Sequence, residues 1–125
     1  MKYKISVDYD LHIVRYKHDG LITADDIGQA WQELLLIPEF SHNKYNLLSD
    51  YRNSKFDMSI EEMGGIIQYL RNLDNVLRGK KQSLLVENPN STALSLLFEN
   101  TVNAQMGFLV KVFTSEQAAI NWLLI

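Results

Sequence analysis

The fold of this chain is decided by residues 45–86, which read YNLLSDYRNSKFDMSIEEMGGIIQYLRNLDNVLRGKKQSLLV. Two short apolar segments, 45–50 and 83–86, are typical of strands, and the second is almost wholly apolar. A strand of that kind is usually covered on both faces, as in a parallel sheet. The longer segment between them has the apolar spacing of a helix. Residues 45–86 therefore predict a strand–helix–strand unit with parallel strands.

The helix of this unit begins and ends at recognisable signals. Ser59 is the expected N-cap, and Glu62, three residues later, completes a capping box. An apolar stripe at helical spacing continues as far as Leu77. Gly79 comes shortly after the last residue of the stripe, at a position where helices often end with a residue in the left-handed backbone conformation. These signals predict one helix between residues 59 and 77.

On the N-terminal side, apolar and polar residues alternate over 2–8, and a second strand is expected over 11–17. The short link between the two strands predicts a hairpin, and residues 18–20 are expected to end its second strand. Thr23 then caps the first helix, which we expect Pro38 to stop.

On the C-terminal side, Asn88 opens the third helix and Gly107 separates that helix from a strand over 108–113. Thr114 or Ser115 is expected to cap a final helix. The expected apolar stripe of the third helix consists of Leu94, Leu97, Phe98, Thr101 and Val102.

The complete order is ββαβαβαβα, in which strands and helices alternate strictly after the hairpin. Such alternation predicts an α/β fold with a mixed, mostly parallel five-stranded sheet and four helices. The sequence shows no linker, internal repeat or shift of composition. We therefore expect a single domain over residues 1–125.

The composition excludes several classes of protein. The chain has 125 residues, of which 46% are hydrophobic and 22% charged, as in globular domains. Its net charge of −3 argues against a nucleic-acid partner, which favours a basic excess. The longest apolar run, 34–37, is far shorter than the roughly 20 residues of a membrane span, and the N-terminus lacks the apolar core of a signal peptide. We expect a cytoplasmic protein without membrane insertion.

The sequence offers no strong catalytic or metal-binding motif. It has no Cys, and His12, His18 and His42 do not have the spacing of metal ligands. We interpret the histidines as exposed or locally hydrogen-bonded. Gly64-Gly65 lies inside a helix stripe, so we interpret it as a site of close helix packing rather than a phosphate-binding loop. We expect no enzyme activity, metal or cofactor.

One group of polar residues is a candidate binding site. In a parallel sheet, ligands bind beyond the carboxyl ends of the strands. Asp50 and Arg52 are expected to follow the third strand, while Asn88 and Ser91 follow the fourth. The free N–H groups of helix N-termini favour an anion there, and Arg52 could add a bidentate contact. The alternative is that Asp50 and Arg52 pair with each other and that the small polar residues only cap helices.

The whole chain resembles the SpoIIAA-like branch of STAS domains. The resemblance is carried by residues 20–23 at the start of the first helix, by 31–40, by the central strand 47–52, and by the closing segments 112–113 and 118–123. It implies a non-enzymatic regulatory module that binds a protein partner.

In many STAS domains, phosphorylation of a serine at the start of the helix after the central strand controls binding of the partner. Asp57 and Ser59 match the family pattern here, while Met58 stands where that pattern has a serine and Ile60 where it has a glycine. The branch is also similar in topology to lipid-carrying SEC14 domains. That similarity implies, as an alternative, a carrier of a small apolar or anionic ligand at the carboxyl ends of the strands. A homodimer is compatible with either function.

Overall fold

The computed structural model describes residues 2–125, and Met1 lies outside the described residues. The strands are β1 (Tyr3–Asp8), β2 (Ile13–Ile22), β3 (Asn46–Phe56), β4 (Lys81–Leu85) and β5 (Leu109–Phe113). The helices are α1 (Ala24–Leu35), α2 (Pro38–Ser41), α3 (Ile60–Arg71), α4 (Asp74–Leu77), α5 (Pro89–Gln105) and α6 (Glu116–Leu123).

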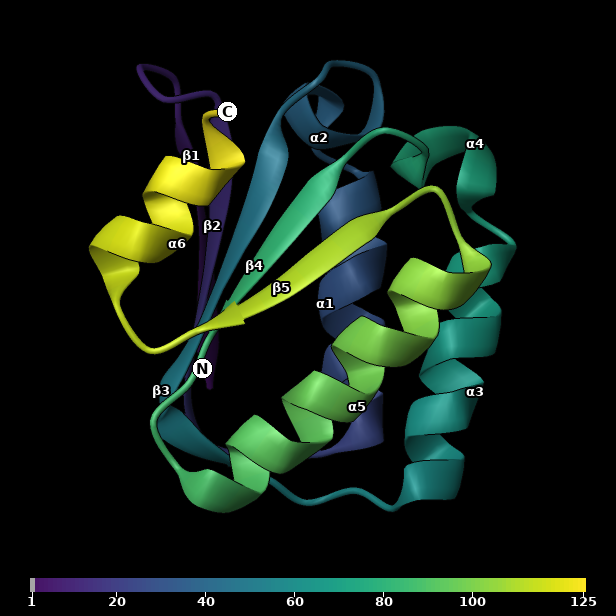
Figure 1. Cartoon of the computed structure of the whole chain (residues 1–125). Helices are drawn as coiled ribbons and strands as arrows, with labels where there is room; N and C mark the ends of the chain where they lie inside the picture. Colours follow the sequence, from purple (N-terminus) through teal and green to yellow (C-terminus); the bar gives the residue numbers. More distant parts are fainter. Residues whose placement is uncertain (1) are drawn as a thin grey trace.

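The five strands form one sheet in the order β1-β2-β3-β4-β5. β1 and β2 pair antiparallel, and every later neighbour is parallel. Because each right-handed crossover moves one strand along in the same direction, α1, α3 and α5 all cover one face, while α6 lies on the other (Figure 1). The predicted α/β fold with a mixed, mostly parallel sheet is confirmed.

Two strands extend further than the sequence predicts. β2 does not end at residues 18–20, and β3 continues to Phe56 instead of ending at residue 50. The two strands keep pairing beyond an irregularity between Lys17 and Asp19, as far as Ile22 opposite Phe56. The sequence did not predict the extension because the added residues are mostly polar. They form strands nevertheless, since backbone pairing with a neighbouring strand does not need an apolar sequence.

The helices number six rather than four among the described residues. Pro38 does not simply stop α1 but stands at the first position of α2, where its missing N–H costs nothing. The helix predicted over 59–77 is divided into α3 and the single turn α4. Gly79 has a φ of 83° directly after the C-cap of α4, as its position predicted.

The main core lies between the sheet and the three helices α1, α3 and α5. Its fully buried side chains include Val14, Tyr16, Leu47, Leu70, Leu77 and Phe108. A smaller core lies beneath α6 and consists of Ile13, Leu48, Ala119 and Leu123.

α5 packs on the main core through Leu94, Phe98 and Val102 of its predicted stripe. Its buried residues are Ser91, Ser95 and Val102, while Leu97 is exposed. The burial of Ser91 and Ser95, which lie beside that stripe, was not predicted. Ser95 lines a cavity beneath α5, which is described below.

Gly64 and Gly65 are exposed, and a Cβ built on either would meet no atom within 4 Å. The prediction of close helix packing is therefore wrong. We expect Gly64→Ala and Gly65→Ala each to raise the free energy of unfolding by about 0.5–1 kcal/mol, because alanine restricts the unfolded chain. Urea denaturation measures the change. Gly79→Ala is the control and is expected to destabilise, since its φ is left-handed; equal effects at all three positions would contradict this explanation.

Candidate functional site

The carboxyl ends of the parallel strands form an open polar hollow of about 480 Å³. Arg52 and Asn88 both line it, together with the exposed Leu21 at the end of β2. The two segments singled out in the sequence thus meet at one rim, as parallel strands require. In Figure 1 this rim is the lower end of the molecule, where α3 and α5 begin.

Arg52 lies within β3 rather than after it, and two carboxylates engage its guanidinium. Nε and one terminal nitrogen donate to the two carboxylate oxygens of Asp50 at 3.0 and 2.8 Å. The same terminal nitrogen donates to Glu116 of α6 at 2.9 Å. Asp50 and Arg52 therefore pair with each other, which is the alternative that the sequence analysis left open. An anion at the rim would meet an arginine whose charge two carboxylates already offset.

The electrostatics of this group agree with its geometry. Burial raises the pKa of Asp50, but the hydrogen bonds from Arg52 outweigh burial and hold that pKa below its usual value. The hydrogen bond to Asp50 raises the pKa of Arg52 in turn. Both groups are ionised at neutral pH, and neither has the shifted pKa of a general acid or base.

Asn88 and Ser91 form the beginning of α5. The Asn88 side-chain oxygen accepts from the backbone N–H groups of Asn90 and Ser91 at 2.9 and 3.3 Å. This cap occupies donors that an anion would otherwise use. Ser91 is buried, and its Oγ has no hydrogen-bond partner among residues 2–125. A docking protein would touch Asn88 but not Ser91.

Ser59 caps α3 at the same end of the molecule, and the predicted capping box is present. Its Oγ accepts from the Glu62 N–H at 3.1 Å, and its own N–H donates to the Glu62 carboxylate at 2.9 Å. Ser59 is exposed, as is its neighbour Ile60. The hydroxyl is therefore accessible, although it lies within reach of a carboxylate.

The histidines are structural. His18 is buried, with Nδ1 at 2.6 Å from the Tyr16 hydroxyl and Nε2 at 3.1 Å from the Leu21 carbonyl oxygen. This agrees with the prediction of local hydrogen bonding. His12 has a φ of 55° in the turn between β1 and β2. Within residues 2–125, no three His, Asp or Glu side chains gather where they could hold a metal ion.

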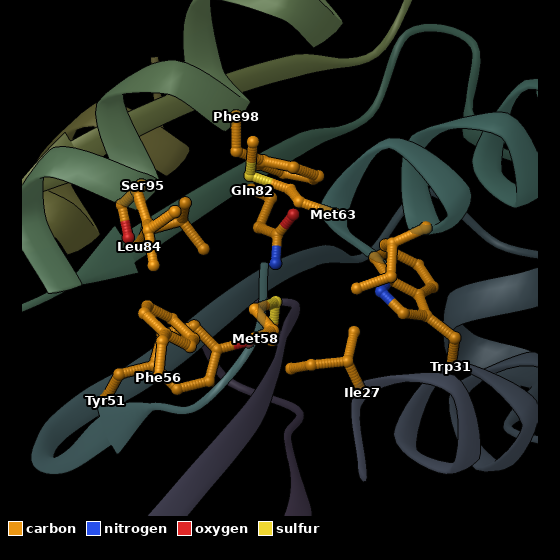
Figure 2. A pocket seen from close by; sticks show the side chains of 12 residues that line it. Ile27, Trp31, Tyr51, Phe56, Met58, Met63, Gln82, Leu84, Ser95 and Phe98 are labelled. Carbon is orange, nitrogen blue, oxygen red and sulfur yellow. The ribbon is translucent and has the colours of Figure 1, made fainter. Parts of the chain in front are cut away.

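A second hollow, which the sequence did not predict, lies between the sheet and the three helices α1, α3 and α5 (Figure 2). It is an apolar cavity of about 50 Å³ with residues of β3 and β4 at its base. Two polar side chains, Gln82 and Ser95, also line it. No sequence pattern pointed to this cavity, because Gln82 and Ser95 belong to a strand and a helix that come together only in the folded chain.

No family model matches the chain, and no curated protein matches it in sequence. One solved structure similar to it is an uncharacterised protein of the DUF3478 family from Shewanella loihica PV-4, described as having a SpoIIAA-like fold. The match covers 97% of this chain and 93% of that chain, with a TM-score of 0.65 and 13% identity. This chain has a SpoIIAA-like fold. The anti-sigma factor antagonist SpoIIAA, in its unphosphorylated form, matches over 96% of both chains, with a TM-score of 0.58 and 13% identity.

The SpoIIAA-like fold confirms the resemblance found in the sequence. At 13% identity the likeness concerns the fold alone, so binding roles for the residues at the rim stay predictions. No helix within residues 2–125 has the length and apolar character needed to span a bilayer.

In this SpoIIAA-like fold the cap at Ser59 has a measurable structural role. We expect Ser59→Ala to lower the free energy of unfolding by about 1 kcal/mol, because the Glu62 N–H loses its acceptor. Ser59→Asp keeps an acceptor and is expected to keep most of the stability. Thr23→Ala, which breaks the matching box of α1, is the control and should cost a similar amount. Thermal and urea unfolding check these values; an equal loss in Ser59→Ala and Ser59→Asp would contradict the capping role.

Proposed function

We propose that this protein is a non-enzymatic regulatory module that binds a protein partner. The observation that carries the proposal is the likeness in fold to SpoIIAA, an anti-sigma factor antagonist, over 96% of the chain. The polar residues of the candidate site support it, because Asp50 pairs with Arg52 and both Asn88 and Ser59 cap helices. Residues fixed in this way shape a surface for recognition rather than supply a nucleophile or a proton.

The docking surface of this proposal is the carboxyl rim, which we define as Leu21, Arg52, Asn88, Ser59 and Ile60. Ile60 is 66% exposed at the first position of α3, and Leu21 is exposed at the end of β2. Apolar anchors next to polar groups that already have hydrogen bonds are favourable for protein docking, since burial then leaves few groups unpaired.

Phosphorylation of Ser59 is the regulatory step of this proposal. A phosphate there would gain from the positive end of the α3 dipole. It would also replace the hydroxyl of the capping box and face the acidic side chains Glu61 and Glu62 in the first turn. The modified rim would carry more negative charge and a rearranged helix start, so its affinity for the partner would change.

Affinity capture from the source organism, with the whole chain as bait, tests the proposal. We expect Ile60→Asp to reduce recovery of a specific partner by about tenfold or more, as for a central anchor of an interface. Leu36→Asp is the matched control, because Leu36 is 81% exposed at the C-cap of α1. That end of α1 leads into α2, which lies at the opposite end of the molecule from the rim in Figure 1. Equal recovery with both variants, each folded by circular dichroism, would reject the carboxyl rim as the docking surface.

Ser59→Glu tests the regulatory step in the same assay. We expect it to change recovery of the partner at least severalfold, whereas Asn72→Glu, at the exposed C-cap of the same helix and away from the rim, should not. An unchanged recovery with Ser59→Glu would remove Ser59 from the proposal. If the only protein captured is a second copy of this chain, and Ile60→Asp prevents its capture, the carboxyl rim is a homodimer interface.

A further inference from the structure

We propose that the cavity beneath α1, α3 and α5 binds a small, neutral, largely apolar molecule that carries one hydrogen-bond donor. This inference goes beyond partner docking, because the cavity lies between the sheet and the three helices and no residue of the carboxyl rim lines it. It rests on two unpaired polar atoms, on the character of the lining, and on the side chains at the opening.

The two polar atoms are Gln82 Oε1 and Ser95 Oγ. Gln82 is 3% exposed and Ser95 is 2% exposed, and neither atom has a hydrogen-bond partner among residues 2–125. A buried acceptor without a donor costs free energy that folding does not recover elsewhere. Gln82 Oε1 can only accept, whereas the Ser95 hydroxyl can donate or accept. Both residues line the cavity, so a ligand hydroxyl that donates to Gln82 Oε1 and accepts from Ser95 would remove that cost.

The orientation of the Gln82 side chain is fixed by its other end. Gln82 Nε2 donates to the hydroxyl of Ser49 on β3 at 3.0 Å. With the nitrogen engaged by the neighbouring strand, the oxygen is left as the acceptor for an occupant. Figure 2 shows the Gln82 carboxamide among the apolar side chains that line the cavity.

The other side chains that line the cavity disfavour a charged ligand. Apart from Gln82, Ser95 and the hydroxyl of Tyr51, the lining side chains are apolar, and none is acidic or basic. An ion would lose its hydration without gaining a counter-charge. The rings of Trp31 and Phe98 offer surfaces against which a planar apolar molecule packs well.

The cavity of about 50 Å³ is smaller than the roughly 150 Å³ that accepts benzene in an apolar protein interior. Binding therefore requires some lining side chains to move. Met58 and Phe98 are only half-buried, and Met58 and Met63 have the flexible, unbranched side chains that adapt to irregular spaces. We infer that these residues yield when the ligand enters between α3 and α5.

Phenol and toluene are the probes, since they have nearly the same shape and only phenol carries a donor. Methyl NMR spectra of the whole chain are recorded during titration with each compound. We expect saturable shifts confined to the methyl groups of Met58, Met63, Ile66, Leu84 and Leu94, with phenol bound about tenfold more tightly than toluene. No saturable shift with either compound, or shifts located elsewhere, would overturn the proposal.

Two variants test the role of the polar atoms. Gln82→Leu removes the acceptor, so we expect phenol to lose its preference over toluene while toluene still binds. Ser95→Ala gives a second measurement if Gln82→Leu does not fold, and it should weaken phenol binding severalfold. The matched control is Ser83→Ala, because Ser83 is a buried serine of β4 that donates to Ala119 beneath α6 instead. Phenol binding that is unchanged in both Gln82→Leu and Ser95→Ala would overturn the assignment.

Discussion

Replacing Phe40 with alanine is expected to lower the free energy of unfolding by about 3–5 kcal/mol. Phe40 belongs to the single turn α2, yet its side chain is fully buried. Its ring packs against Trp31 with centroids 5.9 Å apart, and the Lys80 Nζ lies 4.7 Å from its centroid. The variant would therefore leave a cavity in the main core and remove the aromatic surface beneath a buried cation.

Urea denaturation at pH 7 measures this effect. Phe40→Leu is expected to cost about 1–2 kcal/mol, because most of the volume is kept. The control is Leu36→Ala, four residues earlier in the same connection, which should stay within about 0.5 kcal/mol of the wild type since Leu36 is exposed. A loss below about 1 kcal/mol for Phe40→Ala would show that α2 does not anchor the connection between α1 and β3.

The stability of the protein is expected to rise by about 2 kcal/mol between pH 8 and pH 10. Burial lowers the pKa of Lys80 to about 8 from its usual 10.5. Below pH 8 the lysine is protonated in both folded and unfolded chains. Between pH 8 and 10.5 the unfolded chain holds a proton that the folded chain has released, so the free energy of unfolding increases with pH.

Above pH 10 the trend reverses. Burial raises the pKa of Tyr51 to about 12 and also raises the pKa of Tyr16. The unfolded tyrosines lose their protons near pH 10 while the folded ones keep them, so stability falls from there upward. The combined result is a maximum of stability near pH 10.

Urea midpoints measured from pH 7 to 11.5 test the pH profile, and Lys80→Met is the informative variant. Methionine keeps most of the packing but cannot titrate, so the rise between pH 8 and 10 should disappear while the fall above pH 10 remains. The Lys80 Nζ donates to the carbonyl oxygens of Asn43 and Tyr45 at 2.7 and 2.9 Å, and the variant will lose these bonds at every pH. If the stability of Lys80→Met still rises between pH 8 and 10, a group other than Lys80 causes the rise.

These two predictions concern a segment whose importance the sequence concealed. Residues 38–44 begin with a proline and have no periodic pattern, so the sequence indicates a simple end of helix α1. The basic residues Lys80 and Lys81 form a short run after a helix, which is normally a solvated feature. Lys80 instead holds the connection before β3, and Lys81 donates to the Ile125 carbonyl oxygen at 2.7 Å.

The elements themselves were largely predictable. The capping boxes at Thr23 and Ser59 depend on residues three positions apart, and both are present. The ends of β2 and β3 were not predictable in the same way. Residues 51–56 contain polar side chains at four of six positions, and they form a strand because β2 lies alongside and pairs with them.

The candidate site, too, was predictable from the sequence only in part. The meeting of Arg52 and Asn88 at one rim follows from the parallel order of the strands, which the sequence predicted. The hydrogen bonds of Arg52 to Asp50 and Glu116, and the capping of α5 by Asn88, depend on where these side chains lie in the folded structure. The cavity was outside the reach of pattern analysis, since Gln82 and Ser95 meet across a strand and a helix.

The sequence by itself determined the order of strands and helices, the start of each capped helix and the parallel direction of the central strands, because these depend on contacts between residues close in the chain. The tertiary structure decided how far β2 and β3 extend, which polar side chains of α5 are buried, and where Lys80, Gln82 and Ser95 lie. Those outcomes depend on burial among segments distant in the chain. Burial changes the cost of each polar group, and no local pattern records it.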